Sequence, residues 1–279
     1  MRVIQLGSVG SDVANWQNFL GTRGLSPGRS DGEFDIDTKT ATESFQEEAG
    51  LEADGIVGRD TLAAAVALGF QPAPDISKTL EIKVPMDIDV DGAPNAYGPP
   101  GKPTLDFELN AHEGATSSGT IVGYIVIRGR PAIQQDGDPF PGYFISTTAF
   151  QDLKNPNSLD PRKYVDASKI NYVVRAHIAE VNGVHLGDIV AVHSLRHNSS
   201  VFGIVGDTGH SSGAEGSLAL LQALGYPFTS GKTGSVDEPD IIVRYFPGSN
   251  PDQHFFRDQA QIDSEANDLR LSKDFSAHH

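Results

Sequence analysis

The feature that most constrains the fold of this chain is a short proline-containing stretch at residues 71–75, Gln-Pro-Ala-Pro-Asp. Proline cannot continue a helix, and the residue before it is pushed towards extended geometry, so a linker is expected here. Before this stretch the apolar residues recur at helical spacing, whereas the apolar runs after it are short and β-branched. The sequence therefore predicts a multidomain chain, with a small three-helix α domain at 1–70, a Pro-rich linker at 71–80 and a mainly β domain at 81–250.

The strands of the larger domain are predicted from apolar runs at residues 121–127, 172–174, 189–192 and 241–243. One helix interrupts them at about 217–224, because a serine stands at its start and a glycine follows its end. The tail at 251–279 is polar and charged, which fits either a docking helix or a disordered segment.

The charge balance narrows the class of partner. Lys and Arg together number 21 and Asp and Glu number 37, which gives a formal net charge of −16. Such a surface repels phosphate backbones, so it argues against nucleic acid and anionic lipid and suits a cationic or neutral polymer. Cysteine is absent, which excludes disulfides, thiolate metal sites and cysteine nucleophiles. We expect a monomer that uses no cofactor and no metal.

The sequence shows no obvious membrane or export segment. No apolar run approaches the roughly 20 residues that a membrane-spanning helix requires. The N-terminal stretch MRVIQLGSVGSD lacks a basic segment followed by an apolar one, so no secretory signal is visible. Either a signal has been removed, or the protein leaves the cell by another route.

Two segments of the first domain echo each other. Asp31-Gly32 is followed by Thr38, and Asp54-Gly55 is followed at the same spacing by Thr61. An Asp-Gly pair forms a tight turn, and the threonine is well placed to start a helix. The first domain therefore contains an internal half-repeat.

The half-repeat belongs to a longer ordered series of positions, which are Gly7, Gly10, Val13, Trp16, Gln17, Leu20, Phe45, Gln46, Gly50 and Leu51. Together they resemble the three-helix peptidoglycan-binding domain attached to many wall hydrolases, over about residues 5–68. One departure is Asp35, where that family usually has glycine. The resemblance implies wall binding, with Asp31, Asp54 and Trp16 as candidate residues of the binding module, although most positions of the series serve only to hold a small bundle together.

The most informative stretch for chemistry lies at residues 202–217. An apolar strand delivers Asp207 at its end, and Glu215 stands just before a helix, across a loop of Gly, Ser and Thr. Hydrolysis of a glycosidic bond needs one carboxylic acid to protonate the leaving oxygen and one carboxylate to activate water or attack the sugar. Two acids fixed to regular elements suit that task. On spacing alone they equally fit an Asp in a turn and a Glu that complements a helix dipole.

Several segments of the larger domain resemble the family 75 glycoside hydrolases, the chitosanases first known from fungi. These segments lie at residues 86–97, 137–148, 160–167, 184–188, 205–217 and 246–249. The resemblance covers nearly all of 81–249 and implies endo-hydrolysis of β-1,4-linked glucosamine polymers, with inversion, by Asp207 and Glu215. His210 stands where the family more often has proline, so the choice of substrate can differ.

The strand, Asp-x-Gly turn, loop and helix in this stretch also resemble the double-psi β-barrel of certain lytic transglycosylases. That likeness implies a six-stranded barrel with a few helices. Which of Asp207 and Glu215 is the acid stays open. The helix N-terminus favours ionised Glu215, and an apolar strand end raises the pKa of Asp207, yet the longer Glu is the commoner proton donor.

Other polar and aromatic residues are candidates for substrate binding, namely Tyr97, Asp138, Tyr143, Ser146, Asp188 and His210. The acids among them fit turns as well as a cleft, and the tyrosines fit the core as well as a sugar-stacking platform. Asp87, Asp89 and Asp91 alternate and so share one strand face. Because the glycine and the distal Glu of a calcium loop are missing, we expect a solvated strand face there.

The leading hypothesis is an endo-acting glycoside hydrolase that a binding module holds on the bacterial cell wall, where it cuts the β-1,4 bonds of peptidoglycan. It implies an extracellular, periplasmic or wall location, and phage lysis or injection would explain the missing signal. One alternative is a secreted chitosanase, which the acidic surface favours because chitosan is cationic. Another is a non-catalytic wall-binding protein, and lytic transglycosylation stays open as a variant of the chemistry.

Overall fold

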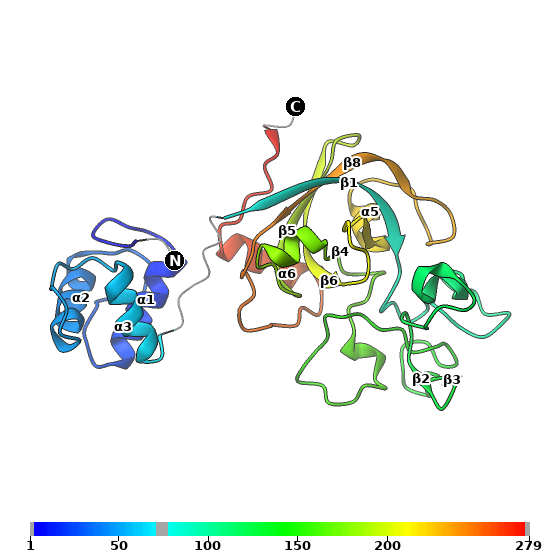
Figure 1. Ribbon diagram of the computed structural model, residues 1–279, viewed down its shortest axis with the longest axis horizontal. Coiled ribbons are helices and arrows are strands. Elements are labelled where there is room, and N and C mark those ends of the chain that lie inside the picture. The colour runs from blue at the N-terminus through cyan, green and yellow to red at the C-terminus, as the bar shows by residue number, and fades with distance from the viewer. Residues whose placement is uncertain (1–2, 71–77, 277–279) are drawn as a thin grey trace. The chain divides into compact units, whose positions relative to one another are not determined.

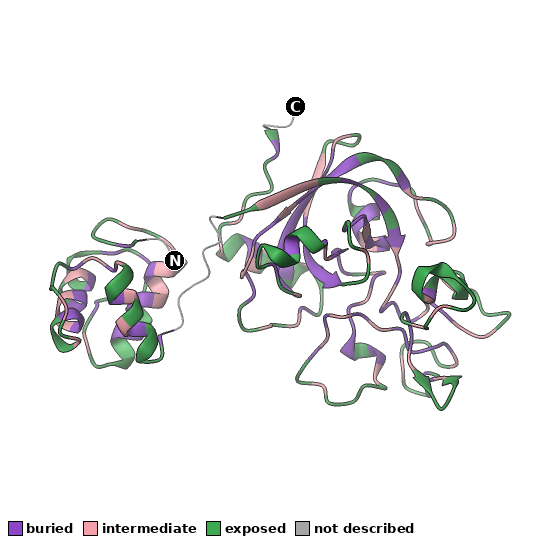
Figure 2. Ribbon diagram, in the orientation of Figure 1, coloured by how far each residue is buried: buried purple, intermediate pink, exposed green. Residues whose placement is uncertain are grey.

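The computed structural model describes residues 3–70 and 78–276, and the chain divides into two compact units, Met1–Asp75 and Ile76–His279 (Figure 1). Each unit has its own hydrophobic core, and Figure 2 shows the buried residues gathered within each. Of the predicted linker at 71–80, residues 71–77 lie outside the described residues.

Three helices form the first unit: α1 (Ser11–Thr22), α2 (Ile36–Glu48) and α3 (Arg59–Ala67). Trp16 is fully buried in their core. Its ring meets those of Phe45 and Phe70 edge-on, with centroid distances of 5.4 and 5.3 Å, and its Nε1 donates to Thr42 Oγ1 at 2.9 Å. The bundle is therefore held by an aromatic cluster whose one polar atom has a partner.

The half-repeat has its structural basis in two buried glutamines. In the first half, Gln17 Nε2 donates to the Glu33 carbonyl and to Thr38 Oγ1, both at 2.9 Å, and Gln17 Oε1 accepts from the Gly32 amide at 3.0 Å. Asp35 then accepts from the Thr38 amide at 2.8 Å and caps α2. The aspartate that departs from the resembled family thus has a capping role.

Gln46 repeats this arrangement in the second half. Its Nε2 donates to the Ile56 carbonyl and to Thr61 Oγ1, both at 2.9 Å, and to Asp54 at 2.8 Å. Its Oε1 accepts from the Gly55 amide at 2.8 Å. Each glutamine ties one helix to the turn that starts the next, and it satisfies backbone groups that would otherwise be buried without a partner.

The second unit is built on a closed barrel in the order β1-β7-β4-β6-β5-β8, whose strands are β1 (Leu80–Asp89), β4 (Tyr172–Val174), β5 (Ile189–Ser194), β6 (Ser199–Asp207), β7 (Glu215–Ser217) and β8 (Val236–Tyr245). The prediction of a helical domain followed by a six-stranded barrel is confirmed. The other elements are β2 (Val126–Ile127), β3 (Arg130–Pro131), α4 (His177–Val181), α5 (Leu218–Ala223), α6 (Gln259–Asp268), and the 3₁₀ turns Glu108–Ala111, Glu113–Ala115 and Pro161–Lys163.

The strand order of the barrel has an internal two-fold symmetry. The symmetry exchanges β1 with β6, β4 with β7, and β5 with β8. Under this exchange every neighbouring pair maps onto a pair of the same orientation. The two parallel pairs, β1–β7 and β4–β6, correspond to each other under this exchange. The crossed arrangement agrees with the double-psi prediction, and it makes the ends of β1 and β6 equivalent positions in the two halves.

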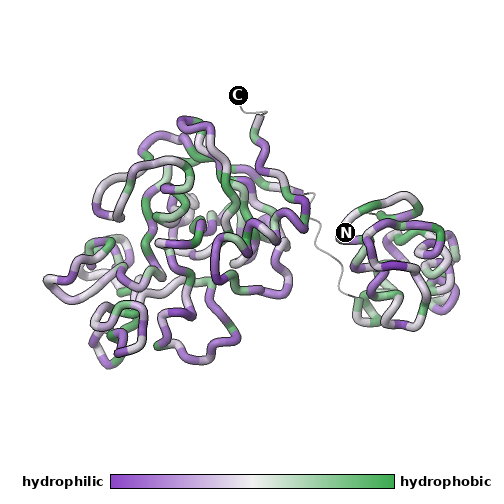
Figure 3. The backbone as a smooth tube through the Cα atoms, turned by 180° about the vertical axis from the view of Figure 1, so that it is seen from behind, coloured by the Kyte–Doolittle hydropathy of each residue, from purple (hydrophilic) through white to green (hydrophobic). Residues whose placement is uncertain are grey.

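The buried residues of the second unit are concentrated in the barrel rather than in the loops. Every residue of β5 is buried, and the most hydrophobic stretches of the tube in Figure 3 run through the barrel while the surrounding loops are more hydrophilic. Towards the C-terminus, α6 packs on β6 and buries Ile262 and Ala266. The polar segment after residue 251 therefore contains a docked amphipathic helix.

Of the other predicted elements, four are confirmed and one is wrong. The runs at 172–174, 189–192 and 241–243 lie in β4, β5 and β8, and the helix predicted at 217–224 is α5 with its capping residues. The prediction of one strand over 121–127 is wrong, because only Val126–Ile127 are strand. The backbone changes partner within the run: the Val122 and Gly123 amides donate to the Ala111 carbonyl, whereas the Ile125 amide donates to Ile145.

Replacing Gln46 by leucine should selectively destabilise the first unit. The change removes the acceptor of the Gly55 amide in the buried turn, and a buried amide left without a partner costs about 1–3 kcal/mol. Chemical denaturation followed by the fluorescence of Trp16, the one tryptophan of the chain, would report this unit. An unchanged midpoint would contradict the role of Gln46 in joining α2 to the turn before α3.

Replacing Gly206 by alanine should destabilise the barrel. A Cβ at this position would lie 2.5 Å from the ring of Tyr172, so β4 and β6 would have to separate. Overpacking of this kind costs about 1–3 kcal/mol, measurable by urea unfolding followed by circular dichroism. Gly21→Ala is the matched control, because a Cβ there meets nothing within 4 Å and alanine favours the helix; equal effects of the two changes would refute the steric explanation.

Candidate active site

Four carboxylic acids come together where strands of the barrel begin and end. Asp89 is the last residue of β1, and Asp91 stands two residues further along the chain. Asp207 is the last residue of β6, and Glu215 is the first residue of β7. β1 and β7 run parallel, with Asp87 opposite Glu215 in the register. The charges of these acids act on one another, which shows that the two predicted catalytic residues share one site with two further aspartates.

Asp207 is buried, with 8% of its surface exposed. Its Oδ1 accepts from the amide of Thr208 at 2.7 Å and from that of Ala149 at 3.0 Å. Its backbone carbonyl accepts from the Arg175 amide at 2.8 Å, which continues the pairing of β6 with the chain after β4. The carboxyl is therefore held by two amides, and the backbone of the residue by a third.

Asp89 and Asp91 are held by the turn that follows β1. Asp89 Oδ1 accepts from the Asp91 amide at 2.8 Å, and Asp91 Oδ1 accepts from the Tyr97 hydroxyl, also at 2.8 Å. The Tyr172 hydroxyl donates to the Asp91 carbonyl at 3.0 Å and also lies near the Asp89 carboxyl, whose charged form it favours. Gly123 borders this turn closely, since a Cβ there would lie 2.9 Å from Asp91 Oδ1.

The site keeps protons to unusually high pH. Burial, followed by the charges of Asp89 and Asp87, raises the pKa of Glu215 to about 8. Burial raises the pKa of Asp89 to about 6, although the hydrogen bond from the Asp91 amide and the nearby Tyr172 hydroxyl oppose the shift. Burial and the charge of Asp89 raise the pKa values of Asp91 and Asp207 well above the usual range. Carboxyls that share a poorly solvated site cannot all ionise together.

The expectation that Asp87, Asp89 and Asp91 form a solvated strand face is therefore wrong for two of the three. Asp87 is exposed, but Asp89 and Asp91 are half-buried and take part in the acid cluster. The sequence did carry a signal for them, because an aspartate and a nearby glycine occur at or just after the end of each strand, as Asp91-Gly92 after β1 and as Asp207-x-Gly209 at β6. Tyr172 and Asp106, which also face the cluster, carried no such signal.

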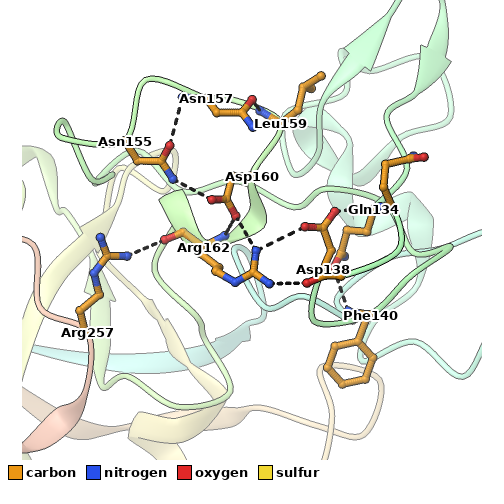
Figure 4. A network of polar contacts seen from close by, with 11 residues as sticks. Gln134, Asp138, Phe140, Asn155, Asn157, Leu159, Asp160, Arg162 and Arg257 are labelled. Carbon is orange, nitrogen blue, oxygen red and sulfur yellow. Dashed lines mark hydrogen bonds and ion pairs between the residues drawn. The ribbon is translucent and has the colours of Figure 1, made fainter.

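Asp138 lies outside this cluster, in a network of loops shown in Figure 4. It accepts from the Gln135 amide at 2.8 Å and pairs with Arg162 at 3.4 Å. Arg162 also contacts Asp160 at 3.2 Å, and its backbone carbonyl accepts from Arg257 at 2.9 Å. In the free protein, Asp138 thus links two loops.

Ser146 and Asp188 are both 1% exposed and serve the backbone. Ser146 Oγ accepts from the Gly92 amide at 3.0 Å and donates to the Gly123 carbonyl at 2.7 Å, so it supports the turn after Asp91. Asp188 accepts from three amides, at distances of 2.8–3.2 Å: His185, Gly248 and Asn250. Of this pair, only Ser146 lies against the acid cluster.

The two tyrosines among the candidates are buried as well. Tyr97 is 3% exposed and reaches the acid cluster with its hydroxyl rather than with the face of its ring. Tyr143 is 8% exposed, with Lys102 Nζ 4.9 Å from its ring centroid. His210 is half-buried in the loop between the two predicted catalytic acids, and its Nδ1 lies 2.8 Å from Ser212 Oγ.

In the first unit, the three candidates for wall binding have structural partners. Trp16 is 0% exposed. Asp31 accepts from the Glu33 amide at 3.0 Å and Asp54 from the Ile56 amide at 2.8 Å, so both stabilise the turns of the half-repeat. The two aspartates are exposed, whereas the tryptophan is out of reach of a ligand.

Neither a cluster of metal ligands nor a membrane-crossing helix occurs among the described residues. Within residues 3–70 and 78–276, no group of three or more His, Asp or Glu side chains is arranged to hold a metal ion. In the same ranges, no helix has both the length and the apolar character that a membrane crossing requires.

The fold and the site define a two-unit protein in which a helical domain precedes a barrel with a buried acid cluster. Residues 9–65 match the family model of the peptidoglycan binding domain, PG_binding_1, so the chain carries such a domain at its N-terminus. Over 60 residues the chain is 43% identical to the spore cortex-lytic enzyme of Oceanobacillus iheyensis. That match covers 22% of this chain and 22% of the relative, so it spans only about a fifth of the relative's length.

Two solved structures are also similar. The SleB N-terminal domain is 39% identical, with a TM-score of 0.24, over 24% of this chain and 92% of that chain. An L,D-transpeptidase from Xylanimonas cellulosilytica is 20% identical, with a TM-score of 0.24, over 83% of this chain and 96% of that chain. At these TM-scores neither likeness bears on the function of the barrel.

The raised pKa values predict a specific dependence of stability on pH. Between the pKa of an unfolded carboxyl, about 4, and those of the folded site, the native state binds more protons than the unfolded state, so the free energy of unfolding falls as pH rises. The melting temperature should therefore be higher at pH 5 than at pH 8, and Glu215→Gln should reduce the difference. Acids with a lowered pKa do not interfere, because they act at lower pH: Asp35, Asp54, Asp160 and Asp240. Greater stability at pH 8 would argue against a buried, protonated cluster.

Proposed function

We propose that this protein is a cell-wall-targeted, endo-acting glycoside hydrolase that cleaves β-1,4 bonds in the glycan strands of peptidoglycan. The observation that carries the proposal is the site shared by Asp207 and Glu215, in which Glu215 has a pKa of about 8. A carboxyl that keeps its proton at neutral pH can protonate a leaving oxygen, and a second carboxyl beside it can act as base.

The two predicted catalytic residues take distinct roles in this proposal. Glu215 is the general acid and gives its proton to the glycosidic oxygen as the bond from that oxygen to the anomeric carbon breaks. Asp207 is the base and takes a proton from the water that adds to the anomeric carbon. Burial and the charge of Asp89 raise its pKa, and the two amides that donate to its Oδ1 oppose this shift by favouring its charged form. The proton gained by Asp207 and the one lost by Glu215 are then re-equilibrated through water.

The first unit supports peptidoglycan as the polymer. A binding domain tethered to a catalytic domain raises the local concentration of substrate without adding any contact at the active site. The name of the curated relative, a spore cortex-lytic enzyme, fits the same choice. A wall location for this chain, extracellular or periplasmic, follows from the proposal.

A second candidate substrate is chitosan. The net charge of −16 favours attraction of a cationic polymer, and the resemblance of residues 81–249 to family 75 chitosanases points the same way. The chemistry at Asp207 and Glu215 would be unchanged, and only the sugar bound in the site would differ.

Substituting Asp207→Asn or Glu215→Gln should reduce turnover by at least about 100-fold, because each change removes one general acid–base group. Both substitutions keep the size of the side chain, so binding to sacculi should match that of the unsubstituted protein. The measurement is release of soluble fragments from purified sacculi, with a pelleting assay for binding. Near-full activity of either variant would remove that residue from the mechanism.

Analysis of the products shows which polymer is cleaved and whether the reaction is hydrolysis or lytic transglycosylation. Purified sacculi and chitosan are digested side by side, and the products are identified by mass spectrometry. Muropeptides with a free reducing end support the proposed hydrolase, whereas anhydro ends would establish a lytic transglycosylase. Glucosamine oligomers from chitosan alone would establish the second candidate, and absence of any product would favour a non-catalytic wall-binding protein.

A further inference from the structure

Asp89 and Asp207 occupy equivalent positions in the two halves of the barrel. Each is the last residue of a strand, β1 or β6, and each of these strands has a parallel partner in the barrel. In the register, Asp89 lies opposite Ser217 of β7, and Asp207 lies opposite Val174 of β4. The two-fold exchange of strands that maps the barrel onto itself therefore also exchanges these two carboxyl-bearing strand ends.

Both carboxyls are fixed by backbone amides just beyond the strand. Asp89 Oδ1 accepts from the Asp91 amide at 2.8 Å, and Asp207 Oδ1 accepts from the Thr208 amide at 2.7 Å. Tyr172 adds a hydroxyl at the Asp89 side, and its ring fills the space that Gly206 leaves on β6. Each acid is thus held in place by the backbone, and the charge of Asp89 acts on Asp207.

The groups that face Asp89 are acids and phenols. They come from β1 and its turn (Asp87, Asp91), β4 (Tyr172), β6 (Asp207), β7 (Glu215) and the loop before residue 107 (Tyr97, Asp106). In the described part of the chain, no lysine, arginine or histidine is among the main influences on Asp89, Asp91, Asp207 or Glu215. A second negative charge in this site would therefore be strongly disfavoured.

We propose that Asp89 and Asp207 carry a single negative charge between them and that this shared charge keeps the acidic proton on Glu215. The pair then ionises in two separate steps, as two carboxyls in one site do. In the singly charged state of the pair Asp207 serves as the base opposite Glu215, and Asp89, which acts through its effect on Asp207 and Glu215, is a positioning residue for the proposed reaction. The catalytic part of this inference rests on the proposed function.

The influences on the pKa values of Asp207 and Glu215 agree with a charge shared by Asp89 and Asp207. After burial itself, the charge of Asp89 is the largest influence that raises the pKa of Asp207, and it is also the largest for Glu215. Asp87 acts on Glu215 in the same direction but more weakly, and it is exposed. Asp87 is therefore a natural control for Asp89, since both lie on β1 and either can be changed to asparagine.

The decisive experiment compares Asp89→Asn with Asp87→Asn in the full chain. Asparagine still accepts from the Asp91 amide, so the turn is kept while the charge is lost. Carboxyl ¹³C NMR, with Glu215→Gln for assignment, should show the pKa of Glu215 lower by about one unit or more in Asp89→Asn, and by less in Asp87→Asn. The pH–rate profile on the active polymer should move to lower pH at both limbs, because Asp207 then ionises more readily as well.

A second variant tests the pair from the opposite direction. Tyr172→Phe removes a hydroxyl that stabilises the charged form of Asp89, so the acidic limb of the profile should move to higher pH. Tyr164→Phe is the control, because the Tyr164 hydroxyl donates to the Ser158 carbonyl at 2.9 Å and takes no part in the cluster. A purely structural role for Tyr172 would lower the rate at every pH without moving either limb.

The outcomes separate the inference from the function on which it rests. If the unsubstituted protein degrades neither polymer, the proposed function fails, while the NMR titration still tests the shared charge. If Asp89→Asn leaves the pKa of Glu215 and the profile unmoved, the shared charge is refuted even in an active enzyme. Complete loss of activity at every pH in a folded Asp89→Asn variant would also overturn it, because Asp89 would then act in the reaction itself.

Discussion

The constraint that dominates the larger unit is that strand pairing and backbone amides must hold four mutually repelling carboxyls together. Asp89, Asp91, Asp207 and Glu215 share a site in which burial raises the pKa of each, and the charge of Asp89 raises it further for the other three. Such a site costs stability, and it persists because the surrounding backbone fixes the acids through amides and strand pairing. A cost of this kind is typical of functional sites, since the raised pKa values that it produces are those that acid–base chemistry requires.

The barrel topology explains how residues so distant in the chain meet. Its crossed strand order places the last three residues of β1 beside β7 and makes the end of β1 equivalent to the end of β6. Close approach of the backbone elsewhere completes the site, since Gly206 leaves room for the Tyr172 ring and Gly123 leaves room for the Asp91 carboxyl. The site is thus a consequence of the strand order, which places β1, β7, β4 and β6 side by side, and no single segment of the chain contains it.

The first unit is stabilised by contacts between its helices and the turns that join them. Two glutamines, Gln17 and Gln46, each bind the turn that precedes the next helix, and one aromatic cluster around Trp16 fills the centre. The residues that make the motif recognisable are largely those that stabilise the bundle. Its sequence therefore identifies the domain reliably, while the surface that meets a ligand leaves little trace in the motif.

The sequence by itself determined the helical domain, the strands in β4, β5 and β8, the capped helix α5 and the two acids that flank one loop, because each depends on local spacing, capping or turn chemistry. The sequence also indicated that Asp89 and Asp91 share one strand face, but it could not distinguish a solvated face from a buried one. Only the tertiary structure decided that these aspartates join Asp207 and Glu215, that Tyr172 faces them and that Tyr97 offers its hydroxyl rather than its ring. The physical reason is that burial and charge coupling arise between segments that strand pairing brings together, and neither quantity is encoded at a single position.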